Sequence, residues 1–88
     1  MAVLEPSKKY AGWNDNIKTA VYAVNANTGD TLDVGVNSAV ADFREVFSAR
    51  FSAPGQTVSC TWNATTGVVT VGTVNAGPVN GYLIVEGQ

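Results

Sequence analysis

The sequence contains no histidine and only one cysteine, Cys60. A catalytic triad built on histidine and a histidine-rich metal site are therefore excluded, and no disulfide can form within the chain. Any chemistry would have to use carboxylates, lysines or hydroxyl groups. We accordingly expect no enzymatic activity, no cofactor and no metal.

Charged residues are scarce as well, with five lysines and arginines against seven aspartates and glutamates and a net charge of -2. The basic pair Lys8-Lys9 is too short to form a patch that binds nucleic acid or an anionic membrane. No apolar run approaches the roughly 18 residues of a membrane span. The sequence therefore favours neither nucleic acid nor a membrane as a partner.

Residues 1–6 lack the pattern of a signal peptide, so we expect the chain to stay in the cell that makes it.

Leucine and methionine, which favour helices, occur only three times and once, whereas valine and threonine occur fourteen and nine times. Such β-branched usage is typical of a pleated, half-buried surface. The 88 residues, 45% of them hydrophobic, suit one small globular domain. The composition therefore predicts an all-β fold. Because a domain of this size has a thin margin of stability and no disulfide, we also expect a homo-oligomer or a partner.

Strict alternation of apolar and polar residues gives the clearest strands, as in Val58, Cys60 and Trp62 with their polar neighbours. Turn signals such as Pro54-Gly55 separate such segments. The expected strands are 17–24, 31–34, 45–53, 57–63, 68–74 and 79–86. The predicted core residues are Val58, Cys60, Trp62, Val69, Val71, Leu83 and Val85. About six antiparallel strands with evenly spaced turns indicate a single small sandwich or flattened barrel over residues 17–88.

Two segments are harder to assign. Apolar residues recur at three- and four-residue steps from Val36 to Phe51, which suits a helix, but alternation from Phe47 suits a strand equally well. We expect one helical turn near 37–43, followed by strand 45–53.

Residues 1–16 show neither the period of two that is typical of a strand nor the period of 3.6 that is typical of a helix. We interpret them as an extended N-terminal arm. Tyr10 and Trp13 within it serve either as anchors on a partner or as a cover for one end of the chain's own core. A chain that starts at Ile17 is expected to stay folded.

Several residues invite a chemical interpretation, and each has a simpler one. Two pairs of carboxylates lie close in sequence, Asp30 with Asp33 and Asp42 with Glu45, and such pairs suit acid–base chemistry or a calcium site. They lack the calcium-loop pattern, and Asp30 suits a turn. Cys60 lies on an apolar face, where its pKa would be raised. Asn63-Ala64-Thr65 matches a glycosylation acceptor, but we interpret it as a turn.

Aromatic side chains are the remaining candidates for binding. Trp62 suits a sugar-stacking platform, although its register with Val58 and Cys60 favours the core. The aromatic residues expected to be exposed for contacts are Tyr10, Trp13, Tyr22 and Tyr82.

Four segments carry a resemblance to a known class of proteins: Gly29–Val34, Phe43–Phe51, Val68–Val71 and Gly81–Gly87. Together they resemble the small β proteins of tailed-bacteriophage virions, which include head decoration or cement proteins. The resemblance implies a non-enzymatic structural protein that is assembled in the host cytoplasm and bound to the capsid surface of the virion. Its implied partner is the major capsid protein, whose subunits it would bridge to stabilise the head. The alternatives are a tail, neck or fibre component and, from another class, a carbohydrate-binding or adhesion module.

Overall fold

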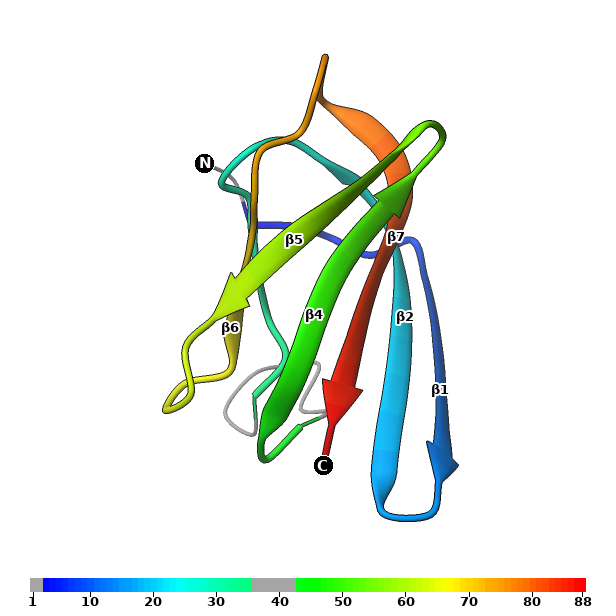
Figure 1. Cartoon of the computed structure of the whole chain (residues 1–88), viewed down its shortest axis with the longest axis vertical. Helices are drawn as coiled ribbons and strands as arrows, with labels where there is room; N and C mark the ends of the chain where they lie inside the picture. The colour runs from blue at the N-terminus through cyan, green and yellow to red at the C-terminus, as the bar shows by residue number, and fades with distance from the viewer. Residues whose placement is uncertain (1–2, 36–42) are drawn as a thin grey trace.

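The computed structural model of the chain describes residues 3–35 and 43–88, and these form seven β-strands (Figure 1). The strands are β1 Lys8–Asn14, β2 Ile17–Ala26, β3 Thr31–Asp33, β4 Val46–Ala53, β5 Gln56–Trp62, β6 Val68–Val71 and β7 Val79–Gly87. The predicted all-β fold is therefore confirmed, with one strand more than expected. Residues 37–42 of the helical turn predicted at 37–43 lie outside the described residues, and Phe43 forms an isolated parallel bridge with Gly35.

All seven strands belong to one antiparallel sheet with the order β1-β2-β7-β4-β5-β6-β3. The sheet curls into a half-barrel, so its inner face folds over a core that the sheet itself supplies (Figure 1). The C-terminal strand β7 lies near the middle, between β2 and β4. Residues far apart in the sequence are thereby brought side by side.

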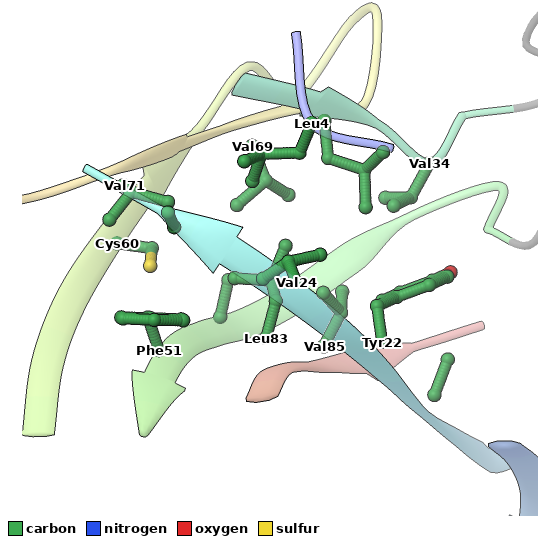
Figure 2. Packing of buried hydrophobic residues seen from close by; sticks show 14 of the residues in the cluster. Leu4, Tyr22, Val24, Val34, Phe51, Cys60, Val69, Val71, Leu83 and Val85 are labelled. Carbon is green, nitrogen blue, oxygen red and sulfur yellow. The ribbon is translucent and has the colours of Figure 1, made fainter. Parts of the chain in front are cut away.

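Strand register decides which side chains fill the core. Tyr22 of β2 lies opposite Leu83 of β7, which in turn lies opposite Phe51 of β4. Opposite residues of an antiparallel pair point to the same face, so these three side chains share the inner face, where all are fully buried (Figure 2). The row links three strands through direct apolar contact and forms the centre of the core.

The residues predicted to form the core lie where the alternation placed them. The buried ones are Val58, Cys60, Val69, Val71, Leu83 and Val85. Trp62 is half-buried and packs against the same cluster, opposite Val69. The six predicted strands correspond to β2 through β7, although β6 ends at Val71 and not at residue 74.

The first described residues form a strap (residues 3–7) across the open side of the curled sheet. Val3 makes a parallel bridge with Thr31 of β3, and the Leu4 amide donates to the Thr31 carbonyl at 2.7 Å. At the other end, the Ser7 amide donates to the Ala23 carbonyl of β2 at 2.9 Å. Leu4 points into the core, where it lies beside Val69 and Val34 (Figure 2). The strap therefore joins the two ends of the sheet.

The predicted arm requires a correction, because residues 8–14 are not aperiodic coil. They form β1, which pairs with β2 from Lys8 opposite Ala23 to Asn14 opposite Ile17. A two-residue turn joins the two strands, and Asp15 in it adopts a φ of 56°. Every β1 side chain is exposed, so the strand carries no apolar alternation that would have revealed it. Together with buried Leu4, this makes residues 3–16 part of the domain, and a chain starting at Ile17 would lose part of its core.

Phe47 is a second correction. The alternation predicted for strand 45–53 would place the rings of Phe47 and Phe51 on the same face of the sheet. In the structure Phe51 is buried and Phe47 is exposed. The register between β4 and β7 shifts between Val46 and Ser48, as in a β-bulge. Because an extra residue reverses the direction of the side chains before it, Val46 takes the inner position and Phe47 turns outward.

We predict that Leu4→Ala destabilises the domain strongly. Leu4 is 5% exposed in the core, whereas its neighbour Val3 is 76% exposed. Loss of a buried leucine side chain costs about 2 kcal/mol or more, a large part of the stability of a small domain. Urea unfolding should show this loss for Leu4→Ala and a change below about 0.5 kcal/mol for the control Val3→Ala. Equal stabilities of the two variants would show that the strap does not contribute to the core.

Candidate functional site

Two acidic side chains, Asp30 and Asp33, form hydrogen bonds within their own segments. Asp30 Oδ2 accepts a hydrogen bond from the Asn27 amide at 2.8 Å, and Asp33 Oδ1 accepts one from the Gly35 amide at 3.0 Å. Both carboxylates thereby hold turns of their own segment. Residues 3–35 and 43–88 contain no cluster of three or more histidine, cysteine, aspartate or glutamate side chains that could hold a metal ion. Asp42, one of the residues considered as an acid–base partner, lies outside the described residues.

Cys60 is a free thiol on the inner face of β5. Burial raises the pKa of the Cys60 thiol, although hydrogen bonds with the backbone of Gly72 and Phe51 oppose the shift. Because the thiolate is the reactive form, this environment holds the sulfur in its unreactive state. Cys60 is therefore a packing residue.

Asn63 also acts within a turn. Its Oδ1 accepts hydrogen bonds from the amides of Thr65 at 2.8 Å and Thr66 at 3.0 Å. The side chain thus closes the turn between β5 and β6, as expected for an asparagine in this position.

Three of the four aromatic residues expected on the surface are there. Trp13 is 64% exposed, Tyr10 57% and Tyr82 51%. Tyr10 and Trp13 therefore do not cover an end of the core, and their role as anchors on a partner stays a prediction. The prediction for Tyr22 is wrong, because this residue is fully buried. Tyr22 shares the inner face of β2 with Ala20 and Val24, and the apolar residues on both faces of that strand concealed which one faces inward.

Tyr10 and Tyr82 belong to one apolar surface on the outer face of the sheet. Tyr10 of β1 lies opposite Val21 of β2, which lies opposite Ile84 of β7. Two residues further along, Ala23 lies opposite Tyr82. We call these five residues the outer patch. It crosses three strands and has exposed rings at Tyr10 and Tyr82, with half-buried side chains between them.

Charged residues border the outer patch. Arg50 lies opposite Ile84 on β4, and its Nη1 is 3.4 Å from Glu86 Oε1. Both charged side chains are substantially exposed, so this ion pair contributes little to stability. An apolar centre with a polar rim is the usual anatomy of a surface that binds another protein.

Trp13 does not belong to the outer patch. It lies opposite Lys18 near the end of the β1–β2 hairpin, and a shift of three residues from Tyr10 puts its side chain on the other face of β1. The Lys18 Nζ lies 5.9 Å from the centroid of the Trp13 ring and 5.5 Å from that of Phe43. The lysine thus joins an exposed ring to a buried one through cation–π contacts.

A groove of about 740 Å³ adjoins the outer patch where the strap passes the ends of β2, β4 and β7. Its lining residues include the aromatic Tyr82 and the polar residues Asn25, Asn80, Glu5 and Ser52. Asn25 Nδ2 donates to Asn80 Oδ1 at 2.9 Å, which fixes the two amides relative to each other. The groove is amphipathic and opens to the solvent.

Comparison of the chain with protein-family models, characterised proteins and solved structures found no match. The described residues contain no helix of the length and hydropathy required to cross a membrane.

Three members of the outer patch were missed by the sequence analysis: Val21, Ala23 and Ile84. A signal was present, because β2 carries apolar residues on both faces from Ala20 to Val24. Strands of that kind are expected where both faces of a sheet are covered. The outer face of β2 is not covered within the described chain, so the pattern indicates a surface that is available to a partner.

We predict that Cys60 makes stability fall in alkaline solution. The unfolded chain releases the thiol proton around its ordinary pKa of 9.0, whereas the folded chain retains it to higher pH. The contribution of this group is complete below the unfolded pKa and is lost as the pH rises through the folded one. Urea unfolding at about pH 8 and about pH 10 should show a larger loss for the natural chain than for Cys60→Ala. Identical pH dependence would contradict a raised pKa.

Proposed function

We propose that the chain is a non-enzymatic structural protein that binds to the surface of a virion head through its outer patch. The observation that carries this proposal is the patch itself, an apolar surface over three strands with exposed tyrosines at Tyr10 and Tyr82. Contiguous exposed apolar surface with a polar rim marks an interaction site in a small protein. Tyrosine is among the residues that contribute most to such interfaces.

The proposed partner is the major capsid protein, in agreement with the resemblance to decoration or cement proteins. Copies on neighbouring capsid subunits would bridge them and add buried contact area that resists the pressure of the packaged DNA. The buried, protonated Cys60 and the turn-bound Asp30 and Asp33 are consistent with a role without chemistry. Assembly would take place in the host cytoplasm.

We predict that Tyr10→Ser combined with Tyr82→Ser strongly weakens binding to virion particles without unfolding the chain. The purified protein is added to particles assembled without it, and bound chain is measured by quantitative mass spectrometry after gradient sedimentation. Loss of two interface tyrosines should weaken binding about tenfold or more. The matched control is Phe47→Ser, which removes another exposed aromatic ring outside the outer patch.

The number of bound copies separates the virion roles. About one chain per major capsid subunit supports decoration of the head. A few copies per particle would instead place the chain in the tail, neck or fibre and overturn the capsid assignment. Full binding by the double variant, or no binding by the natural chain, would overturn the proposal that the outer patch docks on the virion.

A second candidate function is binding of a neutral saccharide in the groove beside the outer patch. The observation that favours it is the combination of an exposed Tyr82 ring with the paired amides of Asn25 and Asn80. An aromatic face stacks on the apolar face of a sugar ring, and each amide keeps further atoms for hydrogen bonds with hydroxyl groups.

We predict that, under this second function, Tyr82→Ala removes saccharide binding whereas Tyr10→Ala retains it, because Tyr10 lies outside the groove. The probes are chitotriose, cellotriose and maltotriose, titrated separately into the labelled chain while amide NMR signals are recorded. Binding should shift the signals of Asn25, Asn80 and Tyr82. Unchanged spectra with all three saccharides at millimolar concentration would exclude this function.

A further inference from the structure

The two edges of the sheet differ. Strand β3 at one edge is covered by the strap through the Val3–Thr31 bridge. Strand β1 at the other edge pairs with β2 on one side, and no strand of the described chain lies on its other side. β1 has seven residues, all exposed and none of them proline. Such a strand presents main-chain donors and acceptors to any strand of suitable sequence.

We propose that β1 pairs with β1 of a second copy, antiparallel, about a two-fold axis at Ala11. The contact joins two seven-stranded sheets into one continuous sheet. This inference concerns the main-chain edge of β1, which shares only Tyr10 with the outer patch, and it stands without the proposed function.

Symmetry restricts the register. In an antiparallel pair, directly opposite residues point to the same face, and a two-fold axis perpendicular to the sheet preserves that face. Each residue must therefore lie opposite a residue of the second copy whose number differs from its own by an even number. The residue on the axis lies opposite the same residue of the second copy. A centre at Ala11 pairs all seven residues from Lys8 to Asn14. Centres at Tyr10 or Gly12 pair fewer of them, and a centre at Lys9 places two ammonium groups opposite each other.

The side chains suit the register centred on Ala11. The small alanine methyl groups meet at the axis. Tyr10 lies opposite Gly12 of the second copy, where an aromatic ring covers the exposed backbone of a glycine. Lys9 lies opposite Trp13 of the second copy, within reach of a cation–π contact of the kind that Lys18 makes with the same ring.

The charges of the hairpin are compatible with this pairing. Lys8 lies opposite the neutral Asn14 of the second copy, which is followed by Asp15, the only carboxylate between residues 8 and 26. Lys8 and Lys9 point to opposite faces of β1, so neither lies directly opposite another cation.

Cysteine cross-linking tests the pairing and its register together. The natural Cys60 is buried and does not compete with an introduced thiol at the surface. Under mild oxidation of the full chain, Ala11→Cys should form a covalent dimer, because the axis brings the two thiols together. The matched control Thr57→Cys places an exposed thiol on β5, inside the sheet. At about 10 µM protein, pairing that gives an effective thiol concentration of about 1 mM makes cross-linking of Ala11→Cys about 100-fold faster than that of the control.

A mixing experiment isolates the register. Lys8→Cys and Asn14→Cys should each dimerise slowly alone, and an equimolar mixture of the two variants should cross-link rapidly. Sedimentation of the natural chain should show a dimer, which Trp13→Ser weakens. Equal rates for Ala11→Cys and Thr57→Cys, rapid dimerisation of Lys8→Cys alone, or a natural chain that remains monomeric at millimolar concentration would each overturn the proposal.

Discussion

Residues 3–35 and 43–88 add no second layer to the sheet, so the sheet excludes water from its inner face by curling on itself, and the rest of this structure depends on that closure. The row from Tyr22 through Leu83 to Phe51 holds the middle of the sheet together. The strap (residues 3–7) crosses between the two ends of the sheet and places Leu4 in the gap. Leu4, near the N-terminus, therefore completes the core.

Much of the fold could be predicted from local pattern. Strands β5 and β7 have one buried and one solvated face, so period-two alternation identified them together with Cys60, Leu83 and Val85 as core residues. β1 could not be found in the same way, because both of its faces are exposed and only main-chain pairing with β2 makes it a strand. Phe47 was misplaced because a bulge depends on how β4 meets β7, and a single strand does not record it.

The candidate site shows a sharper limit. Tyr10 and Tyr82 could be identified singly as exposed aromatics, but they are 72 positions apart in the chain. Only the order β1-β2-β7 places them on one surface with Val21 and Ile84 between them. A site assembled by the register of three strands has no motif in the sequence, in contrast to a loop that carries all of its ligands within a few residues. The local roles of Asp30 and Asn63 were predicted well for the opposite reason, since each bonds to its own turn.

The strap has a consequence for the size of any assembly that grows by strand addition. A sheet with two bare edges can polymerise, because every added copy offers a fresh edge to the next one. Here the Val3–Thr31 bridge closes the β3 edge, so β1 pairing about a two-fold axis uses the remaining edge of both copies. In the proposed dimer growth would then stop at two, and the same few residues that seal the core would also protect the chain from forming fibres.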